Sequence, residues 1–172
     1  MATYANITPL ASADGVTYAS AVALTSTEAD LYNGTALDGQ DPVAVVYGQA
    51  IVAVVQLSVT GKPAGNSTYV VMQTDMGDGV WIDVAWCMYT NNLVSQTFVL
   101  CGGGAGSINN AFQQSRASGS TPTPQASGSN AMPLGGRVRF VGKAVFTGGS
   151  SYVSGESVGV TATIKYKLLG LS

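Results

Sequence analysis

The sequence predicts an all-β protein, an antiparallel β-sandwich or jelly roll in one domain that covers residues 1–172. Val, Ile, Thr, Tyr and Trp alternate with polar residues along most of the chain, and clusters of Gly, Asn, Asp and Ser interrupt this alternation as turns do. A chain of 172 residues can bury about 70% of its unfolded surface in a single core. Signals for helices are few.

Eight strands are expected from this alternation. They are placed at Val16–Thr25, Pro42–Tyr47, Ala50–Thr60, Thr68–Thr74, Gly79–Thr90, Val94–Cys101, Gly136–Phe146 and Ser157–Leu169. The second and third of them make up the most apolar run of the chain, residues 43–59. This run is shorter than the roughly 20 residues that a membrane helix needs, and it contains Gln49 and Gln56. Its β-branched residues therefore favour two paired strands.

The fourth and fifth strands flank the segment DMGDG, residues 75–79. Its residue types accept positive φ, so the segment predicts a tight hairpin turn that contains Asp75 and Asp78. A hard cation such as calcium is the alternative, but the spacing of an EF-hand loop and its terminal Glu are absent. Asp83 on the fifth strand would need a second carboxylate at a defined separation to act in a glycosidase, and the sequence defines none.

Two further segments interrupt the strands. Residues 1–13 are expected to form an N-terminal arm. Residues 102–135 are expected to form a long loop, because they are rich in Gly, Ser, Thr and Pro without apolar periodicity. Loops longer than about 15 residues are usually binding loops or disordered linkers, and both interpretations stay open. The sequence TSTE at Thr25–Glu28 fits a capping box, which predicts one helical turn through Ala29–Tyr32.

The residue types present exclude most enzyme chemistry. The chain has no histidine, so Ser-His-Asp and Cys-His catalysis and nearly all transition-metal sites are excluded. Cys87 and Cys101 are too few for tetrahedral zinc, and we expect both to be small buried residues. The glycine run Gly102–Gly106 lacks the Lys-Ser/Thr pair and the βαβ unit of a nucleotide-binding loop. The sequence thus predicts a protein that is not an enzyme and has no catalytic residue, metal or cofactor.

Three aromatic residues offer an alternative binding chemistry. Trp81, Trp86 and Tyr89 would form a platform for a sugar if they were exposed, although aromatic residues on alternating strand positions are more often part of the core. Their exposure separates a carbohydrate-binding module from a protein that binds other proteins.

Charge is scarce and unevenly distributed. Charged residues make up 9% of the chain against a usual level of about 25%, and such a surface is easily covered by a partner. Residues 1–83 carry eight acids and one base, whereas residues 84–172 carry one acid and six bases. The overall charge of −2 and the lack of interleaved exposed aromatics disfavour nucleic acid as a partner.

Five of the bases alternate with apolar residues on the last two strands. If these strands pair as a hairpin, one exposed sheet face carries all five, and we expect it to contact an acidic surface. An ordinary solvated face is the alternative. In the long loop, Arg116 and Phe112 are expected at the same interface. The predicted interface residues are Arg137, Arg139, Lys143, Lys165, Lys167, Arg116 and Phe112.

The start of the chain, MATYANITPLASADG, has neither the basic nor the apolar region of a secretory signal, so we expect no export and no membrane association. The segment YVVMQTDMGDGVWIDVAWCMYT, the Gly/Ser/Pro-rich loop and the closing GGRVRFVGKAVFTGGSS and VGVTATIKYKLLG together resemble small virion structural proteins of tailed bacteriophages. Capsid decoration, or cement, proteins are the nearest type, and the resemblance covers about residues 42–170.

The resemblance implies a β-sandwich assembled in the host cytoplasm that sits on the outer shell of the virion and bridges capsomers. Its partners would be the major capsid protein and sister copies, in a homo-oligomer on the particle. A tail or fibre component and a carbohydrate-binding module are the alternatives. No active residues transfer from the family.

Overall fold

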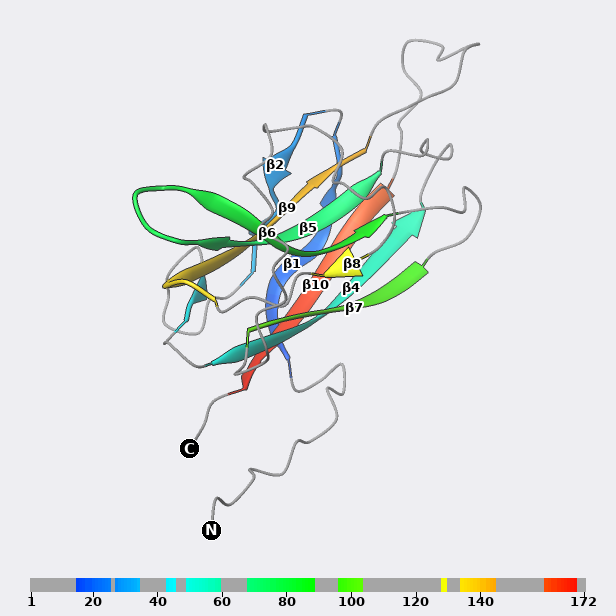
Figure 1. Cartoon of the computed structure of the whole chain (residues 1–172). Helices are drawn as coiled ribbons and strands as arrows, with labels where there is room; N and C mark the ends of the chain where they lie inside the picture. Colours follow the sequence, from blue (N-terminus) through cyan, green and yellow to red (C-terminus); the bar gives the residue numbers. More distant parts are fainter. Residues whose placement is uncertain are drawn as a thin grey trace.

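The computed structural model describes residues 15–25, 27–34, 43–45, 49–59, 68–88, 96–103, 128–129, 134–144 and 160–169. Every regular element in these ranges is a β-strand, and the strands form two antiparallel sheets packed face to face (Figure 1). The prediction of an all-β antiparallel sandwich is therefore confirmed. The described residues contain no helix long and apolar enough to cross a membrane.

The four-stranded sheet has a regular antiparallel ladder at its centre. Its strands, in spatial order, are β1 (Val16–Ala23), β10 (Val160–Leu169), β4 (Ala50–Val59) and β7 (Gln96–Gly103). The pairing of β10 with β4 runs without a shift from Val160 opposite Val59 to Leu169 opposite Ala50. Buried residues on β10 alternate strictly with half-buried ones over most of its length, so one face of this sheet is directed to the core and the other to solvent.

The second sheet has six strands, two of which are long hairpin partners. Its order is β2 (Ala29–Asp30), β9 (Arg137–Lys143), β5 (Tyr69–Asp75), β6 (Trp81–Met88) and β8 (Gly128–Ser129), and β3 (Val43–Ala44) also pairs with β9. All seven residues of β5 are buried, in contrast to the alternation on β10. Both faces of the six-stranded sheet are thus covered along β5.

The main core lies between the sheets and is centred on Tyr18 of β1. The Tyr18 ring packs edge-on against Phe140 of β9 at 4.8 Å and against Tyr166 of β10 at 6.4 Å between ring centroids. Its hydroxyl donates to Asp30 Oδ1 at 2.6 Å and accepts from the Phe140 backbone N–H at 3.2 Å. One tyrosine therefore ties the two sheets together by packing and by hydrogen bonds.

A second apolar cluster lies on the other side of the six-stranded sheet. Its buried residues are Tyr69, Val71, Trp86, Met88 and Val141. They alternate along the strands with main-core residues, such as Val70 between Tyr69 and Val71, so they belong to the outer face. Val71 pairs with both Trp86 and Val141, and Tyr69 pairs with Met88, so the cluster forms two adjacent rows on this face.

Each of the eight predicted strands overlaps a strand of the structure, but two short strands were not predicted. The expected helical turn at Ala29–Tyr32 is wrong, because Ala29 and Asp30 form β2 opposite Gly142 and Val141. The Thr25 hydroxyl bonds to Thr27, and the Glu28 carboxylate accepts from the Tyr69 hydroxyl at 3.0 Å, so the capping box does not form. Tertiary contacts override the local signal here.

The expected loop over residues 102–135 also needs correction. Gly102 and Gly103 end β7, Gly128 and Ser129 form β8 beside β6, and Leu134 is buried in the main core. Gly135 is described as well and precedes β9, whereas residues 104–127, residues 130–133 and the N-terminal arm, residues 1–13, lie outside the described residues. The predicted hairpin of the last two strands is wrong as well, since β9 pairs with β5 and β10 pairs with β1 and β4.

Candidate functional site

Residues 75–83, the segment that contains Asp75, Asp78 and Asp83, form a hairpin turn followed by the start of β6. The turn is closed by two backbone hydrogen bonds, from Met76 N to Val80 O at 3.1 Å and from Val80 N to Gly77 O at 3.0 Å. Gly77, Asp78 and Gly79 all have positive φ, at 110°, 55° and 74°. The prediction of a tight turn at DMGDG is confirmed, and glycine is needed here because few other residues adopt this backbone.

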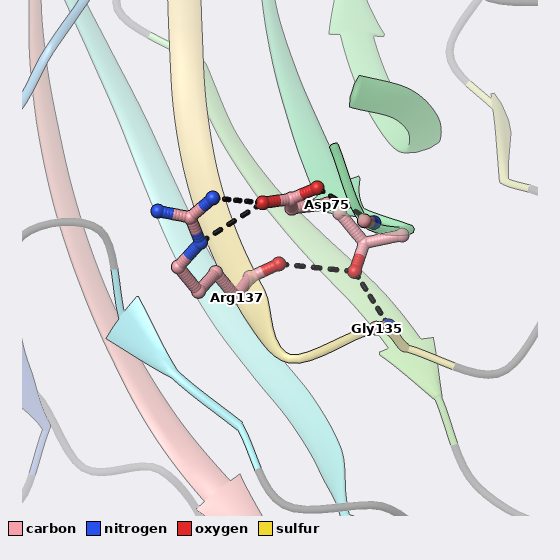
Figure 2. A network of polar contacts seen from close by, with 5 residues as sticks. Asp75, Gly135 and Arg137 are labelled. Atoms are coloured by element: carbon pink, nitrogen blue, oxygen red, sulfur yellow. Dashed lines mark hydrogen bonds and ion pairs between the residues drawn. The ribbon is translucent and has the colours of Figure 1, made fainter. Parts of the chain in front are cut away.

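Asp75, the last residue of β5, holds the turn and the neighbouring strand together (Figure 2). Its Oδ1 accepts from Gly77 N at 2.8 Å, and its Oδ2 accepts from Arg137 Nε at 2.9 Å and also from Arg137 Nη2. The Gly77 backbone N–H, and secondly the Arg137 guanidinium, hold the pKa of the Asp75 carboxyl below its ordinary value. Asp75 therefore stays ionised as a structural anion.

The backbone behind this ion pair is closely packed. The Thr74 hydroxyl donates to Arg137 O at 3.0 Å and accepts from Gly135 N at 2.8 Å, so it links β5 to the residues that enter β9 (Figure 2). A Cβ at Gly135 would lie 1.7 Å from Asp75 O. Only glycine fits at this crossing.

Asp75 and Arg137 form one row of polar contacts across β5 and β9, and a second row lies beside it. Asp83 of β6 is buried and accepts from Gln73 Nε2 at 2.9 Å, while Gln73 Oε1 accepts from Arg139 Nε at 2.9 Å. Gln73 stands opposite Asp83 on one side and opposite Arg139 on the other. The amide thus connects a buried carboxylate to a guanidinium two strands away.

The side chains of Arg137 and Arg139 both lie over the Trp81 ring. Arg139 Cζ lies 4.1 Å from the Trp81 ring centroid and Arg137 Cζ lies 5.6 Å from it. Both distances fit cation–π attraction, and the two arginines reach across β5 to make it. We call Trp81, Arg137 and Arg139 the arginine–tryptophan face.

The carboxylates of this segment differ in their surroundings. Both oxygens of Asp75 accept hydrogen bonds, Asp83 is buried beside Gln73, and Asp78 lies exposed in the turn. Within the described ranges no three His, Cys, Asp or Glu residues gather so that they could hold a metal ion. The carboxylates of the segment are hydrogen-bonded structural groups or turn residues.

The predicted interface residues are divided between opposite faces of the molecule. Arg137, Arg139 and Lys143 on β9 share the outer face of the six-stranded sheet, whereas Lys165 and Lys167 on β10 lie on the outer face of the four-stranded sheet. A single basic face with five bases is therefore wrong: Phe140 of β9 and Tyr166 of β10 enter the same core from opposite sheets. Arg116 and Phe112 lie outside the described residues.

The aromatic residues and cysteines named in the sequence analysis differ in how deeply they are buried. Trp86 is 2% exposed in the second apolar cluster, whereas Trp81 is half-buried, and Tyr89 lies outside the described part of the chain. Cys87 is buried, which raises the pKa of its thiol to about 12, as expected for an inert core residue. Cys101 is exposed on the outer face of β7, so the expectation that it is buried is wrong.

Gln73, Thr74 and Gly135 are parts of the site that sequence reasoning missed. Gln73 and Thr74 follow an apolar run on one strand. Gln73 bonds to Asp83 on β6, but its contact with Arg139 and the contact of Thr74 with Arg137 depend on the pairing with β9, more than sixty positions later. Gly135 carries no chemistry of its own. The signal in the sequence was the polar pair at the end of an otherwise apolar strand. Comparisons with family models, curated proteins and solved structures find no match to this chain.

Proposed function

We propose that this chain is a non-enzymatic virion structural protein, a capsid decoration protein that binds the outer shell of a tailed bacteriophage and bridges capsomers. The observation that carries the proposal is the use of Asp75 and Asp83 in cross-strand rows, where they stabilise a binding scaffold. The likeness of the sequence to small virion proteins and its charged content of 9% support the same conclusion.

The arginine–tryptophan face is the docking surface in this proposal. Arg137 presents a side chain that is 50% exposed, and Asp75 engages only its Nε and Nη2 atoms. Arg139 uses Nε on Gln73 and stacks on Trp81, which orients its remaining donors. Oriented arginines beside a tryptophan are typical of protein-binding hot spots, and their donors suit carboxylates of an acidic capsid surface.

Two other functions are weaker. A sugar platform would require free aromatic faces, but Trp86 is buried and Arg139 covers a face of Trp81. A tail or fibre component would have the same chemistry as a decoration protein and differs only in its place on the particle. The proposed partners are the major capsid protein and sister copies, and nucleic acid has no part in the proposal.

Electron microscopy of virions that carry the protein tests the proposal. Antibody-gold labelling should decorate the outer shell at regular sites, and a reconstruction should place one sandwich across the boundary between capsomers. Label confined to the tail would assign the chain to the tail. Absence of the protein from purified particles would overturn a virion role.

A further inference from the structure

Strand β7 forms an open edge of the four-stranded sheet. It pairs with β4 through eight consecutive residue pairs, from Ala50 opposite Gly103 to Leu57 opposite Gln96, without a register shift. Among the described residues no strand pairs with its other side, and Figure 1 shows β7 as the last arrow of its sheet. Its backbone N–H and C=O groups on that side therefore have no partner strand in the described part of the chain.

The sequence of β7, QTFVLCGG, has none of the features that usually block an edge. It contains no charge and no proline, and its pairing with β4 has no bulge. Natural proteins normally protect long edge strands with Lys, Pro, a bulge or a covering segment, because an open regular edge pairs with other chains. An unblocked edge of eight residues is therefore suited to strand addition.

The side chains of β7 define what kind of strand fits. On the outer face Thr97, Val99 and Cys101 are exposed, and Val99 is the most exposed large hydrophobic residue described, at 62%. Val99 stands opposite Val54 on β4, so the aliphatic surface continues up to the edge. On the inner face Leu100 is buried and Phe98 packs against the main core. A partner strand must be uncharged, with apolar residues on both sides.

We propose that β7 of a second copy of this chain pairs antiparallel with β7 and joins two four-stranded sheets into one continuous eight-stranded sheet. The strand is complementary to itself about Val99. In that register Val99 faces Val99 of the second copy, Thr97 faces Cys101, and Phe98 faces Leu100. Inner residues meet inner residues and no charges oppose each other, which is the condition for a two-fold interface.

The surrounding charges are compatible with this pairing. Lys165 and Lys167 on β10 are the charged residues nearest the edge on the described outer face, and each is two strands from β7. The two β10 strands of the joined sheet would lie five strand spacings apart, about 24 Å. This exceeds the Debye length of about 8 Å in physiological salt, so the lysines of the two copies do not repel appreciably.

The pairing does not depend on the virion proposal, because it is a property of the purified chain. Sedimentation velocity of the full chain should show a concentration-dependent dimer. Val99→Lys should shift the protein to monomer with an unchanged circular dichroism spectrum, since it places two cations face to face at the centre of the edge. Val80→Lys is the matched control: Val80 is 47% exposed in the hairpin turn, and this variant should dimerise like the parent.

Cysteine trapping tests the register without an added charge. In a Cys101→Ser background, Val99→Cys should form a disulfide-linked dimer on mild oxidation, because directly opposed Cβ atoms lie about 5 Å apart. Thr97→Cys in the same background should not, since the two Thr97 positions would be about 14 Å apart. With native Cys101 retained, Thr97→Cys should cross-link again.

A parent that stays monomeric at all concentrations, or equal cross-linking of the two single-cysteine variants, would overturn this interface. Neither result would bear on binding to a capsid, so failure of the pairing is distinguishable from failure of the proposed function.

Discussion

On β5 of the six-stranded sheet every residue is buried, whereas on β4 and β10 of the four-stranded sheet buried residues alternate with half-buried or exposed ones. Both sheets direct one face to the same core, so the difference lies in their outer faces. The six-stranded sheet carries the second apolar cluster and the two polar rows there, and the four-stranded sheet carries valines, threonines and Lys165 and Lys167.

The comparison shows how a protein with few charges uses them. On the six-stranded sheet Asp75 accepts from Arg137 of the neighbouring strand β9, and Gln73 links Asp83 to Arg139, because buried polar groups must find partners. On the four-stranded sheet Lys167 is half-buried and stands opposite Val52 of β4. The charged residues of the six-stranded sheet thus take part in cross-strand hydrogen bonds that hold its strands together.

Truncation of one outer-face residue on each sheet should give the largest contrast. Trp86→Ala removes a side chain that is 2% exposed, and the free energy of unfolding should fall by about 3–5 kcal/mol. Val54→Ala removes two methyl groups from a half-buried position, and the loss should stay near or below about 1 kcal/mol. Urea denaturation measures both. Similar losses would show that the two outer faces are equally buried.

Substitution of two adjacent glycines tests how closely the chain before β9 must approach Asp75. Gly135→Ala places a Cβ against the Asp75 carbonyl oxygen, and we expect a loss of about 1–3 kcal/mol in the free energy of unfolding. Gly136→Ala is the control, because a Cβ there meets nothing within 4 Å, and its effect should stay within about 1 kcal/mol. If both variants unfold at the same urea concentration, the close approach at Gly135 does not constrain the fold.

Acid should weaken the contacts that the Asp75 carboxylate makes with Gly77 and Arg137. The folded pKa of Asp75 lies below its ordinary value of 3.8, so the unfolded chain binds more protons in the interval between the two. Stability from this group is complete above that interval and is lost as the pH falls through the folded pKa. Asp75→Asn should therefore lower the thermal midpoint at pH 7 and flatten its decline below about pH 4. Asp78→Asn in the same turn should behave like the parent.

Much of the fold follows from local pattern. The alternation in VTATIKYKLL predicts a strand with one buried face. The residue types of DMGDG predict a tight turn, and Gly77 and Gly79 have the positive φ that such a turn requires. Pairing does not follow locally: bases at alternate positions on β9 and β10 look alike, yet the strands lie in opposite sheets. The Arg137–Asp75 pair is 62 residues apart in sequence, and only the register of β5 with β9 brings it together.

The predicted capping box at Thr25–Glu28 also failed because of contacts with residues distant in the sequence. Four residues of suitable type are enough to cap a helix, but Glu28 and Asp30 each accept from a tyrosine of the sheets. Buried tyrosine hydroxyls need acceptors, and this requirement outweighs one turn of helix.

Association with capsids stripped of the protein tests the central claim, that the arginine–tryptophan face docks on the particle. Arg139→Gln and Lys167→Gln each remove one positive charge, from opposite outer faces, and circular dichroism should show that both variants are folded. Arg139→Gln should slow association severalfold at low salt, and the effect should shrink as salt rises, while Lys167→Gln should bind like the parent. Equal association rates of the two variants at low ionic strength would contradict the account.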